Sequence, residues 1–206
     1  MKTILIFSVA MLLNLTAQAR FDVGQIAVTS GNARLLTTCS GTAFGGNMIL
    51  TAAHCFPHGW SKIDFNFPGF VGSVNQGTFK YVNDGYGFDF ALIPVEGFQD
   101  QLNLGIQMNS HDLENFLKKV QTDGKCISTW GRVSGQQCGK IVAFDMAKNV
   151  LVLQLTSRHG DSGGPVWIDN TLLGILHSGY GGLTAASLLH WDVLRRLGAE
   201  PESENP

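Results

Sequence analysis

Short apolar runs alternate with clusters of turn residues along most of the chain. In Ile63–Phe67, apolar and polar side chains alternate strictly, as expected of a strand with one buried face. The predicted strands are Ile26–Val28, Gly41–Phe44, Met48–Thr51, Ile63–Phe67, Phe79–Val82, Phe90–Pro94, Cys126–Trp130, Lys140–Phe144, Val150–Leu155, Pro165–Ile168 and Leu172–His177. Strands this short and this closely spaced are typical of barrels and sandwiches, so we predict an all-β fold.

Apolar residues fall at helical spacing in two segments, Leu113–Val120 and Ser187–Leu197. The first segment lies in the seam between two strand-rich halves, near residues 103–122. We therefore expect a single domain at residues 20–205. It would contain an N-terminal β unit at about 24–105, a C-terminal β unit at about 122–185 and a C-terminal helix at about 187–197.

Residues 1–19 have the features of a secretory signal peptide. Lys2 supplies a positive start, Ile4–Leu15 is an apolar run, and residues 17–19 have the small-residue pattern that precedes a cleavage site. The run is too short and too close to the terminus for a good membrane span, although a membrane anchor is the alternative. We expect cleavage before Arg20 and a secreted or periplasmic protein.

Composition narrows the classes of function. The chain has 206 residues, 25 glycines and a formal net charge of −2. Abundant glycine suits a turn-rich β protein. The near-neutral charge gives no electrostatic reason to expect binding to nucleic acid or to an anionic membrane surface, so we expect neither as a partner once the signal peptide is removed.

The four cysteines are expected to form disulfides, because export leads to an oxidising compartment. Among the three ways of pairing them we favour Cys39–Cys55 with Cys126–Cys138, since each bridge closes a short local loop. A zinc site that includes a nearby histidine is the alternative. No two cysteines have the close spacing of a zinc knuckle, so we expect no metal site and no cofactor.

Gly160–Pro165 has the sequence Gly-Asp-Ser-Gly-Gly-Pro and carries the strongest chemical signal in the chain. A nucleophilic serine needs backbone N–H groups that point toward a developing oxyanion. Glycines around Ser162 permit the backbone dihedrals and the close approach of a substrate that this requires. An ordinary turn is the alternative, because all of these residues are turn formers. Ser162 is thus a candidate nucleophile.

Two further stretches contain a candidate base and a candidate orienting acid. His54 follows the predicted strand Met48–Thr51, and imidazole is the natural base near neutral pH. Asp89 opens an apolar strand, where its burial is costly unless a partner such as a histidine Nδ1–H pairs with it. The alternatives are a structural histidine beside a disulfide and a solvent-facing aspartate in a turn.

The three stretches together resemble a chymotrypsin-like (trypsin-fold) serine protease. Thr51–Cys55 and Gly160–Pro165 match the two signature blocks of that family. Asp89–Leu92 resembles its Asp-Ile-Ala-Leu block with one conservative replacement. The candidate residues also follow one another in the order of the family, histidine, aspartate and serine. The resemblance covers roughly residues 24–197.

This resemblance implies a fold, an activity and a set of roles. The fold is two packed antiparallel β-barrels of the chymotrypsin type with a C-terminal helix. The activity is hydrolysis of peptide bonds in a peptide or protein substrate, with His54, Asp89 and Ser162 as the catalytic triad. The backbone N–H groups of Gly160 and Ser162 are implied to form the oxyanion hole.

The cysteine pattern departs from that of typical animal members, which contain more disulfides. Ile168 stands where the usual partner of Cys126 would be. The segment from Cys138 to Ile141 resembles the compact bacterial members of the α-lytic protease type, which close this hairpin with a local bridge. That resemblance supports Cys126–Cys138 and suggests a bacterial secreted enzyme.

The means of activation is left open. In many members, cleavage creates an amine that pairs with the aspartate before the nucleophile, here Asp161. One hypothesis is that Arg132 or Arg158 pairs with Asp161, so that no amine is needed. The alternative is that cleavage after Arg20 lets Phe21 supply the amine.

The resemblance also assigns a set of substrate-binding residues: Thr156, Ser157, His177, Ser178, Gly179 and Tyr180. The pocket base contains no acidic residue, so a preference for Arg or Lys lacks its counter-charge. His177 resembles the histidine with which glutamyl endopeptidases bind an acidic side chain, with help from nearby serine hydroxyls. We therefore expect a preference for Glu, with Asp or Gln as alternatives. A core histidine at a strand end is the other interpretation of His177.

Two other functions fit the sequence less well. A catalytically inactive relative that serves as a binding protein is expected to lack a triad residue, and none is missing. An esterase of the α/β-hydrolase kind needs the order serine, acid, histidine, which is the reverse of the order here. We therefore predict a monomeric serine endopeptidase.

Overall fold

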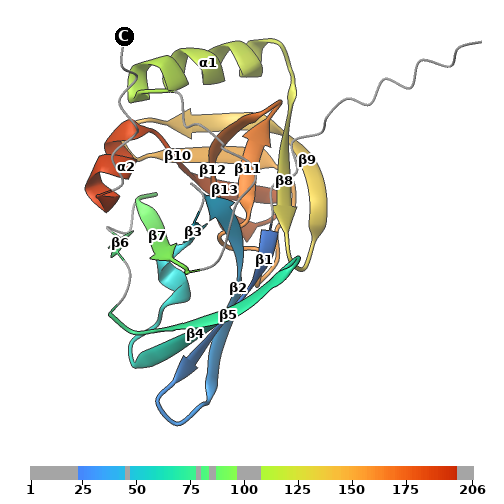
Figure 1. The fold of residues 1–206 in the computed structure, drawn as a ribbon. Helices are drawn as coiled ribbons and strands as arrows, with labels where there is room; N and C mark the ends of the chain where they lie inside the picture. The colour runs from blue at the N-terminus through green and yellow to red at the C-terminus, as the bar shows by residue number, and fades with distance from the viewer. Residues whose placement is uncertain (1–22, 45–46, 78–79, 84–86, 97–107, 199–206) are drawn as a thin grey trace, which may run out of the picture.

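Figure 1 shows the fold in a computed structural model of the chain, which describes residues 23–44, 47–77, 80–83, 87–96 and 108–198. The predicted signal peptide, Arg20, Phe21 and the first part of the predicted seam lie outside the described residues. Strands make up most of the described chain, which confirms the all-β class.

The N-terminal half forms a seven-stranded antiparallel sheet, coloured blue to green in Figure 1. Its strands are β1 (Val23–Ser30), β2 (Leu35–Phe44), β3 (Met48–Thr51), β4 (Trp60–Phe67), β5 (Phe70–Asn75), β6 (Lys80–Asn83) and β7 (Asp89–Pro94). They lie in the order β5-β4-β1-β2-β3-β7-β6. Thr51 at the end of β3 pairs with Ala91 of β7, so the segment after β3 lies beside the start of β7.

The C-terminal half forms a closed antiparallel barrel, coloured yellow to orange-red in Figure 1. Its strands are β8 (Cys126–Gly131), β9 (Gly135–Asp145), β10 (Val150–Gln154), β11 (Pro165–Ile168), β12 (Thr171–Tyr180) and β13 (Leu183–Leu188). They close in the order β10-β13-β12-β11-β8-β9. Closure leaves no unpaired edge strand, which makes this half a rigid support for the loop between β10 and β11.

Two α-helices complete the described chain. Helix α1 (Ser110–Thr122) begins where Asn109 accepts a hydrogen bond from the N–H of Asp112, and it buries Leu113, Leu117 and Val120. Helix α2 (Trp191–Leu197) ends at Gly198 in the left-handed conformation. The expected C-terminal helix is therefore present, but its expected start at Ser187 is wrong, because Ser187 and Leu188 belong to β13. Neither helix has the length and apolar character that crossing a membrane requires.

The two halves share packing and buried polar contacts. The apolar side chains of α2 that are buried, Val193, Leu194 and Leu197, belong to the core of the N-terminal sheet, although α2 follows the C-terminal barrel. In addition, the side-chain amide of buried Asn149 donates to the carbonyl of Gly87, two residues before β7. These contacts fix β7, and with it Asp89, relative to the barrel that carries Ser162.

Candidate active site

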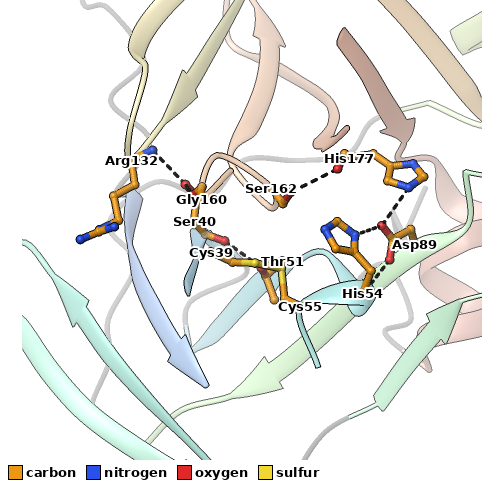
Figure 2. Close-up of a disulfide and its surroundings, with 10 residues drawn as sticks. All are labelled: Cys39, Ser40, Thr51, His54, Cys55, Asp89, Arg132, Gly160, Ser162 and His177. Atoms are coloured by element: carbon orange, nitrogen blue, oxygen red, sulfur yellow. Dashed lines mark hydrogen bonds and ion pairs between the residues drawn. A yellow bond between two sulfur atoms is a disulfide. The ribbon is translucent and has the colours of Figure 1, made fainter. Parts of the chain in front are cut away.

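The pairing of β3 with β7 brings His54 to Asp89. His54 lies in a 3₁₀ turn, η1 (Ala53–Cys55), directly after β3, and Asp89 is the first residue of β7. The carboxylate binds His54 twice. Its Oδ2 lies 2.5 Å from Nδ1 of the ring, and its Oδ1 accepts the backbone N–H of His54 at 2.8 Å. Figure 2 shows these contacts beside the disulfide of Cys39 and Cys55, which ties η1 to β2.

Asp89 is suited to hold the imidazole because it stays ionised. Asp89 is buried, with only 2% of its surface exposed to solvent. Burial alone would raise the pKa of Asp89, but the hydrogen bonds and electrostatic attraction from His54 outweigh burial and hold the pKa below its usual value. An ionised carboxylate at Nδ1 keeps the proton on that nitrogen and leaves Nε2 free to act as a base.

The loop that carries Ser162 is fastened to strand β2. The N–H of Ser40 donates to the carbonyl of Ser162 at 2.8 Å, and the Ser40 hydroxyl donates to the carbonyl of Gly160 at 2.8 Å. The hydroxyl of Thr42 donates to the carbonyl of Gly163 at 3.0 Å. Ser40 and Thr42 are fully buried, and the sequence interpretation did not single them out. The small polar residues Ser40 and Thr42, close after Cys39, were the sequence signal that could have indicated this contact.

Gly163 cannot be replaced without disturbing this contact between the halves. Its φ is +86°, and a Cβ there would overlap the Ser40 carbonyl and the Thr51 hydroxyl. The Thr51 hydroxyl itself donates to the Ser40 carbonyl at 2.7 Å. Close packing between the loop and the N-terminal sheet thus requires a glycine at position 163.

Asp161 is fully buried, and backbone N–H groups satisfy its carboxylate. Oδ1 accepts from Val133 at 2.8 Å and from Ser134 at 3.0 Å, and Oδ2 accepts from the N–H of Arg158 at 2.7 Å. The hypothesis that an arginine side chain pairs with Asp161 is therefore wrong, because Arg158 contributes its backbone N–H instead. In the described part of the chain, neither the Arg132 nor the Arg158 side chain forms an ion pair with Asp161.

The hydroxyl of Ser162 donates to the carbonyl of His177 at 3.2 Å. In Figure 2, the His54 ring lies between Asp89 and Ser162, with the ring edge opposite Asp89 turned toward the serine. Backbone hydrogen bonds hold the residues on either side, since Asp161 donates to Arg158 and Gly163 donates to Leu176. The N–H groups of Gly160 and Ser162 donate to no backbone acceptor among the described residues, so both are available to a ligand.

His177 lies in β12, at the end of the predicted strand Leu172–His177, and its ring faces Asp89. A bulge between Leu176 and Ser178 interrupts the pairing of β12 with β13 at this residue, and bulges re-aim side chains. The imidazole turns toward the triad, with Nε2 3.5 Å from Oδ2 of Asp89 and the ring centroid 5.5 Å from that of His54. The ring therefore lies beside the Asp89 carboxylate, and the expected role of His177 in binding an acidic substrate side chain stays a prediction.

The other expected substrate-binding residues lie around the β12–β13 hairpin. A Cβ on Gly179 would overlap the hydroxyl of Ser157, so Ser157 packs directly against this glycine. The Ser157 hydroxyl lies 3.1 Å from Oγ1 of Thr184, which the sequence interpretation missed. The backbone carbonyl of Thr156 accepts from the side chain of Gln137, and Tyr180 at the hairpin tip is 93% exposed. Ser178 pairs with Ala185 across the hairpin.

Both favoured disulfides are formed, since Cys39 is bonded to Cys55 and Cys126 to Cys138. The first fixes the turn that carries His54. The second joins β8 to β9 at the hairpin where the sequence pattern predicted a local bridge. None of the four thiols is therefore available as a metal ligand.

Comparisons with known proteins agree with this geometry. The family model described as Trypsin matches residues 17–187. Similar solved structures include HL collagenase, with 18% identity and a TM-score of 0.62 over 85% of this chain and 93% of that chain. The serine endoprotease from Yersinia pestis has 18% identity and a TM-score of 0.58 over 84% of this chain and 60% of that chain. A human pathogenic astrovirus serine protease has 16% identity and a TM-score of 0.53 over 80% of this chain and 88% of that chain.

At these identities the solved structures establish a shared fold and nothing finer. A search of curated protein sequences found no match. The family model, in contrast, spans most of the chain and includes His54, Asp89 and Ser162. The chain therefore belongs to the trypsin family of chymotrypsin-like serine proteases.

Proposed function

We propose that the chain is an exported serine endopeptidase that hydrolyses peptide bonds through an acyl-enzyme on Ser162. The observation that carries this proposal is the double contact between Asp89 and His54, which orients the imidazole toward the loop that strand β2 holds in place. Family membership supports a peptidase of this kind. The two disulfides agree with an oxidising compartment, and the features of residues 1–19 supply the route to it.

The reaction follows from the arrangement of the three side chains. For this reaction the Ser162 hydroxyl, which donates to the His177 carbonyl in the structure, must turn to Nε2 of His54. Its oxygen then bonds to the substrate carbonyl carbon while Nε2 takes the proton. The carbon–nitrogen bond breaks as His54 returns that proton to the leaving amine. Water next attacks the ester, again with His54 as the base, and regenerates the serine.

The negative charge that develops on the substrate oxygen needs donors fixed in advance. The N–H groups of Gly160 and Ser162 are the proposed donors, on either side of buried Asp161. Because three backbone N–H groups already hold Asp161, we infer that the loop needs no new amine to keep its conformation. Each donor to such an oxyanion contributes about 3 kcal/mol to transition-state stabilisation.

Labelling with a fluorophosphonate probe tests the nucleophile. We expect the protein purified after export to react at one serine, with its N-terminus at Arg20. Ser162→Ala should abolish labelling, and His54→Ala should slow it at least about 100-fold, because general base catalysis is lost. Ser61→Ala is the control and should label normally, because the Ser61 hydroxyl in β4 donates to the carbonyl of Thr29 and contacts none of the three proposed catalytic residues in the described structure. Unchanged labelling of Ser162→Ala would contradict Ser162 as the nucleophile, and a wild-type protein that never reacts would favour the inactive binding protein.

The primary specificity is the finer part of the proposal. With the His177 ring at Asp89, the groups placed beside Gly179 are the hydroxyls of Ser157 and Thr184. These hydroxyls can donate hydrogen bonds to a Glu, Asp or Gln side chain. They do not supply the positive charge that was expected from His177. We therefore propose a preference for small, uncharged residues at the primary site.

A panel of peptides that differ only at the primary site checks this preference. We expect kcat/KM for Ala, Ser or Val to exceed that for Glu, Phe or Arg by at least about 10-fold, because larger or charged groups would displace the Ser157 hydroxyl. A highest value for Glu would restore the original expectation and would contradict the proposed preference for small, uncharged residues.

A further inference from the structure

Three metal-ligating side chains converge at the candidate active site. Oδ2 of Asp89 lies 2.5 Å from Nδ1 of His54 and 3.5 Å from Nε2 of His177. The ligand atoms of all three side chains lie within 4.8 Å of one another. Figure 2 shows both rings turned toward the same carboxylate. The cysteines near His54 add no ligand, because both are in a disulfide.

His177 carries an independent sign that its hydrogen bonding is incomplete. Its Nδ1 is buried and has no hydrogen-bond partner in the described residues. A neutral imidazole has one N–H and one lone pair. With the proton on Nε2, this N–H faces Asp89 and the buried Nδ1 lone pair has no partner. With the proton on Nδ1, a buried donor is unpaired and the Nε2 lone pair faces a carboxylate oxygen. In this second tautomer, a cation between Nε2 and Asp89 would bind both groups.

A neutral imidazole ring can offer its lone pair to a metal ion. The His177 ring is partly accessible, with 28% of its side chain exposed, and the His54 side chain is 39% exposed, so an ion can enter from solvent.

We propose that His54, Asp89 and His177 form an inhibitory Zn²⁺ site. Two imidazoles and one carboxylate, with a water molecule in the fourth position, are a ligand set that zinc favours, at about 2.0–2.2 Å from each atom. Ligands of a tetrahedral ion with such bonds lie roughly 3.4 Å apart. The Asp89–His177 pair has that separation already. The His54–Asp89 pair must open by about 1 Å.

Zinc binding here would block catalysis for a definite chemical reason. The metal would take the lone pair of Nδ1 of His54, so the proton on that nitrogen would move through solvent to Nε2. An Nε2–H cannot accept the proton of Ser162, and the bond that orients the ring would be replaced by two metal bonds. No covalent bond is made or broken elsewhere, so removal of the ion should restore the base.

The binding test uses Ser162→Ala protein, which keeps all three ligands and cannot digest itself. Titration of ZnCl₂ in a non-chelating buffer, followed by calorimetry, is expected to show one ion per chain. His177→Ala and Asp89→Asn, each in this background, should weaken Kd at least about 10-fold, since loss of even an outer-shell partner can cost that much. His111→Ala, on the exposed face of α1, is the matched control and should leave Kd unchanged.

A second measurement separates loss of a ligand from loss of the fold. Zinc should raise the Tm of the Ser162→Ala protein and of the His111→Ala control, but not that of a folded His177→Ala protein. Mg²⁺ and Ca²⁺, which prefer oxygen ligands, should have no effect at the same concentration. An equal Tm rise in His177→Ala, or a Kd that responds to His111→Ala instead, would overturn the site.

The inhibitory part of the proposal rests on the proposed function, and it is tested by peptidase activity, apart from zinc binding. In active enzyme, Zn²⁺ should inhibit and a chelator should restore activity. The inhibitory concentration should rise at least about 10-fold in His177→Ala, measured against that variant's own activity. Zinc that binds with the expected ligand dependence to a protein without peptidase activity would sustain the site and refute the protease. A fully active, zinc-loaded enzyme would refute inhibition.

Discussion

Replacement of Asp89 by asparagine is expected to lower kcat about 10,000-fold near neutral pH, with little change in KM. An asparagine can keep the 2.8 Å bond from the backbone N–H of His54, because its carbonyl oxygen can stand where Oδ1 stands. Its NH₂ group then faces Nδ1 of His54. Nδ1 must accept a hydrogen bond, the ring proton moves to Nε2, and the imidazole can no longer remove the proton of Ser162.

Steady-state kinetics on the best peptide of the specificity panel measures this effect. Asp64→Asn is the matched control, because Asp64 is a half-exposed aspartate of β4 that pairs with Lys62. It should retain kcat within about 2-fold, since exposed ion pairs of this kind contribute little. Equal Tm values for the two variants would show that the fold is intact. A loss below about 10-fold for Asp89→Asn would mean that this carboxylate does not set the tautomer of the base.

Most strands could be predicted from the sequence because their apolar residues alternate or form short runs. Two strands were missed, for different reasons. In β5, Val71 is exposed and glycine and serine interrupt the pattern, so little apolar alternation is left to recognise. In β13, the run Ala185-Ala186-Ser187-Leu188 consists of residues that are common in helices. Pairing with β10 and β12 on both sides overrides that local preference.

The candidate triad of His54, Asp89 and Ser162 could be proposed from the sequence because each residue lies in a local motif. His54 and Asp89 meet as expected at the ends of neighbouring strands. Their environment could not be predicted in the same way. The orientation of His177 depends on a bulge, and a shift of one residue in register turns a side chain to the opposite face of the sheet. The role of Ser40 depends on contact with residues 120 positions away, which no local pattern encodes.

Replacement of the buried Asp161 is expected to reduce stability strongly. Asp161→Asn is expected to lower the free energy of unfolding by about 3 kcal/mol, the scale of lost hydrogen bonds to a buried charged acceptor. The carboxylate accepts N–H groups on both oxygens, so the NH₂ of asparagine must face at least one donor whichever way it is turned. Close packing prevents relief, because Asp161 lies directly against the backbone of Gly131.

Urea denaturation measures this loss, with Asp145→Asn as the matched control. Asp145 also accepts a backbone N–H, from Lys148 at 3.0 Å, but its side chain is 45% exposed. Water can therefore replace the bond, and the free energy of unfolding should change by less than about 0.5 kcal/mol.

Because Asp161 lies between Gly160 and Ser162, whose N–H groups are the proposed oxyanion donors, kcat of Asp161→Asn should fall while KM changes less. Stability equal to that of Asp145→Asn would show that water or a shifted loop satisfies the three N–H groups. Normal kcat in a destabilised variant would separate the fold of this loop from its part in catalysis.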